Sequence, residues 1–277
     1  MLLRFTKMHG LGNDLMVLDL ISQHAYIQPQ QIRAWSDRRF GVGFQRLALI
    51  EVPRHPDDDF SCRMFNTDGV EIDWLVSDLC CVARLVADKR LISKAQMRVA
   101  MRHAVLDVQV HLDGSVSVPI TPPEFHAERV ALPHSLIQQQ ESQAWLLENS
   151  VTMVSMDGPH AVLLVKDLSK VPMAELAVYL EQQPGIPAGT TLSAVQVHDA
   201  STIEVRTWQL GQGAIEGFHP SLCASAASII KQGKVNRQVR LEFASGQAKA
   251  WLQWLESEEN MYLTGASTRV YEGQIRI

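Results

Sequence analysis

Residues 77–86, SDLCCVARLV, are matched later in the chain by residues 220–229, PSLCASAASI, so that Leu79–Cys80 falls on Leu222–Cys223. Apolar residues recur at helical spacing in both segments, which predicts one helix near 76–88 and another near 220–232. Upstream, GNDLMVLDL at 12–20 resembles GPHAVLLVKDL at 158–168, in the same order and at a similar spacing. Matches at both ends of each half favour an internal duplication.

A pair of strands is expected after each of these helices. Apolar residues alternate with polar ones over 106–112, and the chain then turns at 113–114, an Asp-Gly pair typical of a hairpin. In the second half the alternation covers 239–243 and is followed by a Ser-Gly turn at 245–246. Each half therefore predicts the same local order, a helix and then a β-hairpin.

The fold class predicted from these repeats is α+β, with two pseudo-symmetric lobes. Each lobe is expected to be a mostly antiparallel sheet wrapped around one central helix. We expect residues 1–119 with 266–277 to form the N-terminal lobe, and residues 120–265 to form the C-terminal lobe. The final strand would then return to the first lobe. The segment PITPPEF at 119–125 lies at the join, where its prolines disfavour regular structure.

Composition excludes several functional classes. The 277 residues are 46% hydrophobic with a net charge of −5, and no basic cluster exceeds DRR at 37–39, which argues against nucleic-acid binding. Apolar runs such as AVLLV at 161–165 are too short to span a bilayer. The first ten residues do not form a signal peptide, so we expect a cytoplasmic protein that does not associate with membranes.

The four cysteines are Cys62, Cys80, Cys81 and Cys223, and they form neither a CxxC pair nor a zinc-ligand spacing. We expect them to be reduced and structural, with no metal and no cofactor bound. The glycine-rich segment GLGNDL at 10–15 lacks the third glycine of a dinucleotide-binding loop, which argues against nucleotide binding.

Several motifs, taken in order, carry a family resemblance: FTKMHGLGNDLMVLD at 5–19, DRRFGVGF at 37–44, FNTDGVE at 65–71, SMDGPHAV at 155–162, GQG at 211–213 and TGASTRVYEGQI at 264–275. Together they resemble the diaminopimelate epimerase family over nearly the whole chain. The resemblance implies cofactor-independent chemistry, an active site in the cleft between two lobes, and a homodimer. It also implies two cysteines, one from each lobe, that face opposite sides of an amino-acid Cα: one thiolate removes a proton and the other thiol delivers one.

The two cysteine positions of the family are not cysteines here. Where the family reads Cys-Gly-Asn-Gly and Cys-Gly-Ser-Gly, this chain reads LVSD at 75–78 and FHPS at 218–221. The thiol positions therefore correspond to Leu75 and Phe218. Cys80 and Cys223 cannot replace them, because each lies five residues further on, more than one helical turn away.

Other positions that the resemblance assigns to substrate binding also differ. Val76 and His219 replace glycines whose N–H groups hold the substrate carboxylate, and Gln209–Leu210 replaces a Glu-Arg pair. Leu192 and Gly158 occupy the positions of two asparagines in the family, and Arg46 occupies the position of a glutamine. Asn13, Asn66 and His160 are retained and are the polar ligand-binding candidates. Asp73, Asp78 and Glu216 are interpreted as helix-start carboxylates.

These replacements predict a protein that does not epimerise diaminopimelate. The first interpretation is a pseudoenzyme, a non-catalytic binding or regulatory homologue that acts on a protein partner. The alternative is a repurposed cofactor-free isomerase, lyase or cyclase that takes a small apolar ligand in the cleft. The walls of that cleft would then be Leu75, Val76, Leu192, Leu210 and Phe218, and Gln209 is a further ligand-binding candidate. The sequence leaves open whether that cleft is filled or open. His219 is either the candidate base of such a reaction, kept neutral by the helix dipole, or a solvent-facing residue at a helix start.

Overall fold

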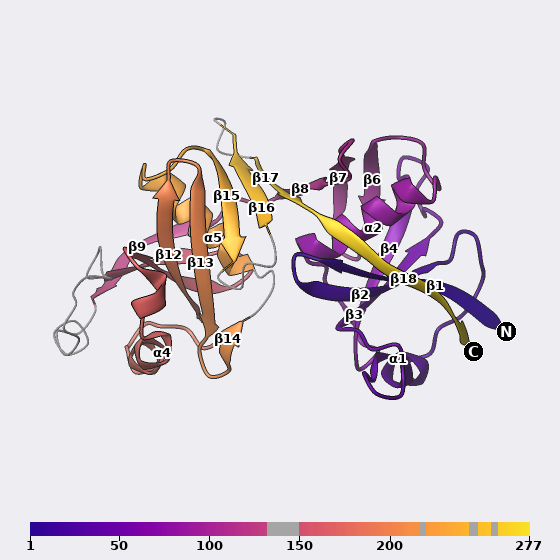
Figure 1. The fold of residues 1–277 in the computed structure, drawn as a ribbon, viewed down its shortest axis with the longest axis horizontal. Helices are drawn as coiled ribbons and strands as arrows, with labels where there is room; N and C mark the ends of the chain where they lie inside the picture. Colours follow the sequence, from indigo (N-terminus) through magenta and orange to yellow (C-terminus); the bar gives the residue numbers. More distant parts are fainter. Residues whose placement is uncertain (132–149, 216–219, 244–248, 256–259) are drawn as a thin grey trace. The chain divides into compact units, whose positions relative to one another are not determined.

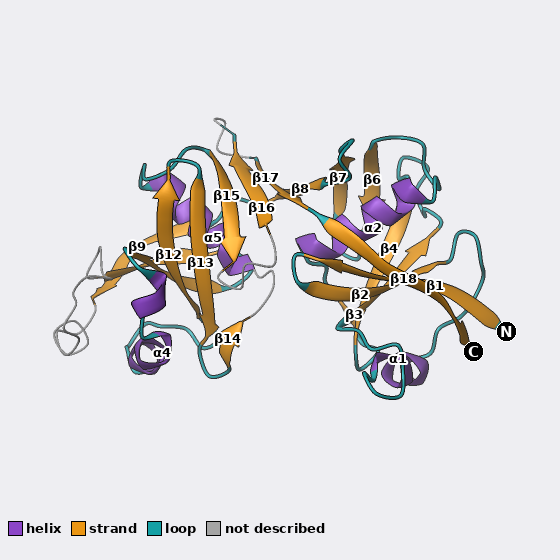
Figure 2. Ribbon diagram, in the orientation of Figure 1, coloured by secondary structure: helices purple, strands orange, loops and turns teal. Residues whose placement is uncertain are grey.

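The computed structural model describes residues 1–131, 150–215, 220–243, 249–255 and 260–277. The chain divides into two compact units (Figure 1). Unit 1 comprises Met1–Pro119 and Thr264–Ile277, and unit 2 comprises Ile120–Leu263. Sheet predominates in both units, and four α-helices occur among the described residues (Figure 2). None of the helices in this part of the chain is both long and apolar enough to cross a membrane.

Unit 1 contains a mixed sheet whose neighbouring strands are mostly antiparallel. Its elements are β1 (Leu2–Gly10), β2 (Asn13–Asp19), α1 (Pro29–Ser36), β3 (Arg46–Glu51), β4 (Phe60–Asn66), β5 (Glu71–Ile72), α2 (Val76–Asp88), β6 (Gln96–Ala100), β7 (Val105–Val110), β8 (Val116–Ile120) and β18 (Ser267–Arg276). The antiparallel pairs are β1–β18, β1–β2, β3–β4, β4–β5, β6–β7 and β7–β8. Two pairs, β2–β3 and β4–β6, are parallel.

Helix α2 is the interior helix of unit 1. Its residues are buried on every side from Val76 to Ala83, as expected for a helix that is apolar nearly all round. It packs against β1, β2, β3, β7 and β18. Helix α1 covers a separate apolar cluster, in which Ile32 and Trp35 contact core residues of the sheet. The start of α2 is therefore held by several strands at once.

Unit 2 repeats the same order of strand pairing. Its elements are β9 (Glu124–Ala131), β10 (Ser150–Ser155), β11 (Pro159–Val165), a 3₁₀ turn (Leu168–Lys170), α4 (Met173–Glu181), β12 (Thr191–Asp199), β13 (Thr202–Gln209), β14 (Gly213–Ile215), α5 (Pro220–Lys231), β15 (Gln238–Phe243), β16 (Lys249–Trp254) and β17 (Met261–Gly265), which ends beyond the unit boundary. Pairs β9–β10, β10–β11, β12–β13, β13–β14 and β15–β16 are antiparallel. Pairs β11–β12 and β13–β15 are parallel.

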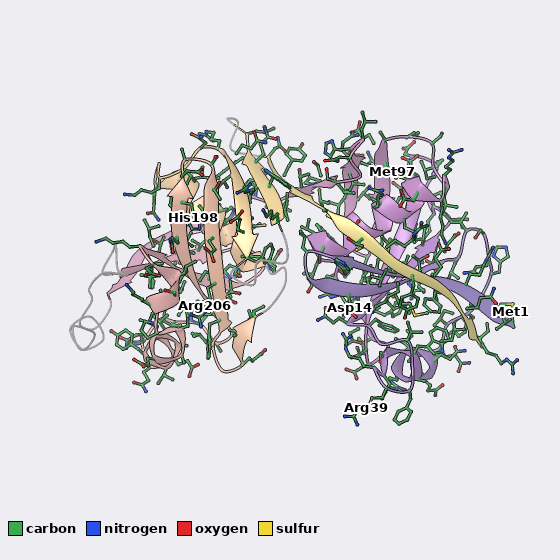
Figure 3. The ribbon with its side chains drawn as sticks, viewed as in Figure 1. Met1, Asp14, Arg39, Met97, His198 and Arg206 are labelled. Atoms are coloured by element: carbon green, nitrogen blue, oxygen red, sulfur yellow. The ribbon has the colours of Figure 1, made fainter. Side chains whose placement is uncertain are left out.

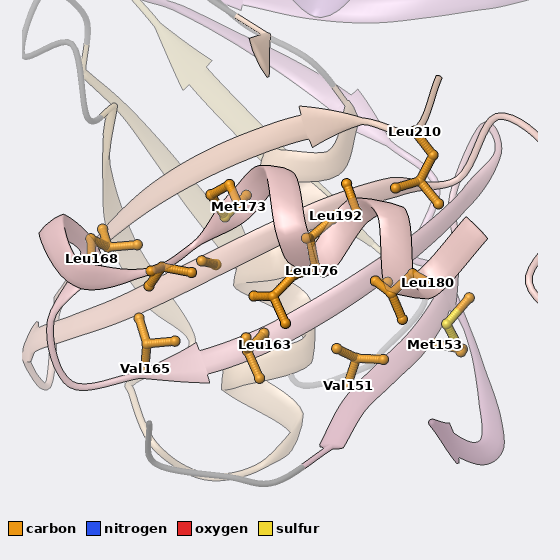
Figure 4. Packing of buried hydrophobic residues seen from close by; sticks show 14 residues of the cluster. Val151, Met153, Leu163, Val165, Leu168, Met173, Leu176, Leu180, Leu192 and Leu210 are labelled. Atoms are coloured by element: carbon orange, nitrogen blue, oxygen red, sulfur yellow. The ribbon is translucent and has the colours of Figure 1, made fainter. Parts of the chain in front are cut away.

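Two helices cover the sheet of unit 2. Residues Ser221–Ile230 of α5 are all buried, and this helix packs against β10, β11, β12, β13, β15 and β16. Helix α4 lays Leu176 and Leu180 over a second apolar cluster with Leu163 and Val165 of β11 (Figure 4). Unit 2 thus has its own hydrophobic core.

Several sequence-based predictions about these elements can be compared with the structure. The two predicted helices are confirmed as α2 and α5, and the return of the final strand is confirmed by the antiparallel pairing of β18 with β1. The prediction of an irregular join at 119–125 was too broad, because β8 runs to Ile120 and β9 begins at Glu124. Leu112 is fully exposed in a turn and not in a strand, since β7 ends at Val110. The predicted turn at 245–246 lies outside the described residues.

Candidate functional site

The start of α2 is the part of the candidate site that the structure describes. Leu75 is the N-cap residue, with an extended backbone and a half-buried side chain. Val76, Ser77 and Asp78 form the buried first turn. The Asp78 carboxylate accepts a hydrogen bond from the Leu75 N–H at 2.7 Å, which satisfies one of the donors that a helix start leaves without an intrahelical partner.

Gly10 of β1 allows the first turn of α2 to lie close to the sheet. A Cβ atom at this position would be 2.6 Å from the carbonyl oxygen of Ser77 and 2.9 Å from the sulfur of Cys81. Both distances are shorter than real Cβ contacts, so only glycine fits without a shift. The strand and the helix start are therefore fixed relative to each other.

A partly buried ion pair lies at the helix start. Arg46, on β3, donates from Nη1 to Asp78 Oδ2 at 3.1 Å and to the carbonyl oxygen of Asp73 at 3.0 Å. The Asp78 side chain is 2% exposed, whereas that of Arg46 is 23% exposed. Burial raises the pKa of Asp78 to about 6, although Arg46 and the Leu75 N–H both favour the ionised form.

The two retained asparagines of unit 1 lie beside this ion pair. Asn13, on β2, donates from its amide nitrogen to the Ser77 hydroxyl at 3.1 Å, so it contacts the first turn of α2 directly. Asn66, on β4, is the strand partner of Arg46. Its side-chain oxygen accepts hydrogen bonds from the N–H groups of Asp68 and Val70, and it thereby closes its own turn. The structure thus brings Asn13 to the helix start, whereas the side chain of Asn66 stabilises its own turn.

Asp14 anchors the neighbouring loop, a role that motif reasoning did not assign. Its carboxylate accepts from Lys7 and from Arg38, and Lys7 also donates to the carbonyl of Gly43. Burial alone would raise the pKa of Asp14, but the hydrogen bonds from Arg38 and Lys7 outweigh it, and the pKa is lowered. Asp14, labelled in Figure 3, therefore ties the 37–44 segment to the start of β2.

The four cysteines are free thiols and all are buried, as expected. Burial raises the pKa of each, to about 12 for Cys80. Cys80 lies within α2, with its sulfur 3.7 Å from the carbonyl oxygen of Val116. Because a thiolate is the reactive form of cysteine, buried thiols of this kind are inert.

In the Gln209–Leu210 pair of unit 2, the side chain of Gln209 forms hydrogen bonds within its own unit. The side chain of Gln209 donates to the carbonyl of Gly189 and accepts from the Thr191 hydroxyl, at 3.2 Å. It thus holds the loop that leads into β12. The sequence analysis did not assign a role to Thr191. A polar side chain next to Leu192 is the feature that could have indicated its contact with Gln209.

Leu192 and Leu210, expected to line the cleft, are core residues of unit 2. Leu192 is fully buried and Leu210 is 7% exposed. Both side chains belong to the cluster covered by Leu176 and Leu180 of α4 (Figure 4). Both side chains therefore pack within the hydrophobic core of unit 2.

His160, the retained histidine of unit 2, is 2% exposed. Its Nε2 lies 2.7 Å from the carbonyl oxygen of Met156. Burial lowers its pKa, which keeps the ring neutral at pH 7. Phe218 and His219, the other thiol position and the candidate base, lie outside the described residues, as does Glu216.

The described part of the site therefore contains an ion pair but no group that could react with a substrate. At the helix start, the titratable side chain is Asp78, and it is paired with Arg46. Leu75 presents an alkyl group that can neither donate nor accept a proton. This arrangement can bind a carboxylate, and the carboxylate that it binds in the structure is the side chain of Asp78.

Comparison with known proteins gives the family. No protein-family model matches the chain. It is 38% identical over 280 residues to a diaminopimelate epimerase of Pseudomonas syringae pv. syringae, and 40% identical over 284 residues to one of Ectopseudomonas mendocina. Both matches cover 100% of each chain.

Solved structures share the fold at much lower identity. A PhzF-family phenazine biosynthesis protein of Bacillus anthracis has a TM-score of 0.69 at 14% identity, with 100% of both chains covered. A methylitaconate-delta-isomerase has a TM-score of 0.65 at 13% identity, covering 99% of this chain and 95% of the other. The full-length relatives at 38–40% identity show that the chain belongs to the diaminopimelate epimerase family.

Proposed function

We propose that this chain is a non-catalytic member of its family, a pseudoenzyme that acts through binding or regulation and does not epimerise diaminopimelate. The observation that carries the proposal is the start of α2. An apolar residue, Leu75, occupies the position that the family resemblance assigns to a thiol, and the described cysteines are all buried in the core.

Cofactor-free inversion of a Cα centre requires two groups that can exchange a proton on opposite faces of the substrate. Leucine and phenylalanine, the residues at the two thiol positions, have no proton to exchange. The remaining thiols do not substitute for them, because burial raises the pKa of each and suppresses its thiolate form. Both halves of the reaction would therefore lack their acid and base.

The same proposal covers the two lobes, the oligomeric state and the partner of the protein. The shared order of strand pairing in the two units supports pseudo-symmetric lobes that arose by duplication. We propose a cytoplasmic homodimer, by analogy with the family, and a protein partner as the target of a regulatory role. No cofactor is invoked at any step.

The second candidate is a repurposed isomerase, lyase or cyclase for a small apolar ligand. The apolar side chains of Leu75 and Val76 favour it. A methylitaconate-delta-isomerase shares this fold, so the fold accommodates a second isomerase reaction. Leu192 and Leu210 do not support it, since both pack in the core. The first candidate is therefore preferred.

Solvent isotope exchange tests the proposal. The purified chain is incubated with diaminopimelate in D₂O, and deuterium at Cα is followed by NMR, with the Pseudomonas syringae relative as the positive control. We expect no exchange above a protein-free sample. A variant that carries both Leu75→Cys and Phe218→Cys should also stay inactive, because Gln209 is held by Gly189 and Thr191. Exchange by the unmodified chain would contradict the proposal.

A further inference from the structure

A pocket lies at the turn between β12 and β13, within unit 2. Its volume is about 630 Å³, and its lining comes from the 199–202 turn, from side chains between residues 236 and 240, and from Trp251 of β16. A pocket of this size can hold a small organic molecule. None of the lining residues belongs to the candidate site at the start of α2.

The pocket is also remote from the site residues of unit 2. Strand β12 ends at Asp199 and β13 begins at Thr202, whereas Gln209 is the last residue of β13. Strand β13 has eight residues, which span about 25 Å at the usual rise of a strand. In Figure 1 the β12–β13 turn lies at the opposite end of these strands from β14. The pocket is therefore a separate candidate site.

Hydrogen bonds hold the wall of this pocket in place. The Asn236 N–H donates to the carbonyl oxygen of Ala200 at 2.7 Å. The Arg240 N–H donates to the carbonyl oxygen of Ser201, also at 2.7 Å. The Asp199 carboxylate closes the turn, because it accepts from the Ser201 N–H at 2.7 Å and from the Ser201 hydroxyl at 2.8 Å. The turn and the start of β15 are thus fixed relative to each other.

Arg240 and Trp251 lie side by side on one face of the sheet. They are directly opposite each other in the antiparallel pairing of β15 with β16, so their side chains leave the sheet on the same face. Trp251 is 40% exposed, although it is one of the largest apolar side chains in the protein. Part of an aromatic ring is therefore accessible at the pocket wall, next to a guanidinium.

The Arg240 side chain has a donor without an acceptor. Its Nη2 donates to Glu242 Oε1 at 2.8 Å. Its Nε is buried and has no hydrogen-bond partner among the residues that the structure describes. A buried N–H without an acceptor is unfavourable, so an oxygen of a bound molecule that met it would be stabilised. The side chain as a whole is 39% exposed and lines the pocket, which brings this donor to the pocket wall.

The charges of the lining favour a neutral ligand. The two charged residues of the lining, Asp199 and Arg240, have opposite signs, and Arg240 is already paired with Glu242. An anion would be repelled by the Asp199 carboxylate, and a cation by the guanidinium. The other polar side chains of the lining carry hydroxyls and amides, which bond to neutral hydroxyl groups. A ring with an apolar C–H face and hydroxyl groups at its edge would match both these groups and the indole.

We propose that the pocket at the β12–β13 turn binds a neutral sugar. The C–H face of the sugar ring packs on the indole of Trp251, whose π-face is electronegative, and a sugar oxygen accepts from Arg240 Nε. The site goes beyond the proposed function, because it uses no residue of the α2 start. It does not depend on whether the chain is catalytic.

The test titrates the ¹⁵N-labelled full chain with cellobiose, with maltose and with benzoate, and follows the Trp251 indole N–H and the Arg240 Nε–H by NMR. We expect at least one disaccharide to shift both signals saturably, and benzoate to leave them unchanged. Trp251→Ala, read at the Arg240 signal, should weaken that binding at least about ten-fold. Arg240→Lys, read at the Trp251 signal, should weaken it as strongly, since lysine keeps the charge beside Glu242 but has no Nε–H.

Arg206→Gln is the matched control. Arg206 lies on the same face of β13 as Thr202 but does not line the pocket, so its loss should leave the binding of the disaccharide unchanged. Three results would overturn the inference: no saturable shift with either disaccharide, binding of benzoate in their place, or disaccharide binding that is unchanged in Trp251→Ala or in Arg240→Lys. If Arg240→Lys does not fold, Trp251→Ala decides alone. The isotope-exchange test of the proposed function is independent of all these results.

Discussion

At the scale of single residues, Asp78 combines two opposing effects. It accepts the Leu75 N–H and pairs with Arg46, which stabilises the start of α2. Its burial nevertheless raises the pKa of the carboxyl to about 6, so ionisation is less favourable in the folded chain than in water. The folded protein therefore binds a proton at Asp78 more strongly than the unfolded chain does.

The stability of the protein should consequently depend on pH through Asp78. A raised pKa in the folded state means that its contribution is greatest below pH 3.8 and is lost as the pH rises through about 6. Relative to Asp78→Asn, the unmodified chain should gain on the order of 2–3 kcal/mol of unfolding free energy between pH 7 and pH 4. Urea denaturation of both proteins across that range measures the difference.

The comparison with Asp78→Asn is needed because His160 acts in the opposite direction. Burial lowers the pKa of His160, so its protonation in acid opposes folding. That effect is common to both proteins and cancels in the difference. A difference in unfolding free energy that is constant from pH 4 to pH 7 would contradict the role of Asp78.

Side-chain type alone predicted only part of the site. Asp78 was interpreted from sequence as a helix-start carboxylate, and it does bind the Leu75 N–H. Its partnership with Arg46 was not predicted, because 32 residues separate the two and the packing of α2 against β3 brings them together. Leu192 and Leu210 are apolar, but their residue type does not reveal that their side chains pack in one cluster with Leu176 and Leu180 of α4.

At the scale of elements, the approach of α2 to β1 depends on Gly10. A side chain there would collide with the Ser77 carbonyl, which belongs to the helix backbone and cannot rotate away. Gly10→Ala should therefore displace the first turn of α2 and lower the unfolding free energy by about 1–3 kcal/mol, the usual cost of overpacking. Denaturation by urea gives the value.

A second variant separates the two contacts of Gly10. Cys81→Ala would relieve the 2.9 Å contact with sulfur but leave the 2.6 Å contact with the backbone oxygen. Adding Cys81→Ala to Gly10→Ala should therefore restore little stability. Full recovery in the double variant would show that the sulfur, and not the helix backbone, limits the approach.

The sequence predicted the long elements better than the short ones. Helices α2 and α5 were correctly expected because their apolar residues recur over three turns. Helix α1 and helix α4 were not predicted, since each is short and lies outside the repeated segments. The prolines at 119–125 correctly marked a break, but the break is short, since β8 runs one residue beyond Pro119 and β9 begins directly after Pro123.

At the scale of the whole molecule, the two units have separate cores. The cluster around Leu176 lies entirely within unit 2, and the cluster around Ile32 lies entirely within unit 1. Unit 2 is one continuous segment, whereas unit 1 needs both ends of the chain. The two units should therefore differ in their ability to fold alone.

Residues 120–263 expressed alone should give a cooperative thermal transition by circular dichroism, because their core is complete. Residues 1–119 alone should not, since β1 would lack its partner β18 over the whole register from Leu2 to Gly10. Addition of a peptide covering 264–277 should restore the transition of the 1–119 fragment. A cooperative transition of residues 1–119 without the peptide would contradict this division of the chain.

The pairing of β18 with β1 also imposes an order on events at the ribosome. Strand β1 borders β2 on one edge, and its other edge stays uncovered until β18 has been synthesised. At about 5–20 residues per second, translation of the intervening unit keeps that edge open for on the order of ten seconds. Unit 2, although made later, is completed first. During synthesis, the edge of β1 that later pairs with β18 is therefore exposed to unwanted strand pairing.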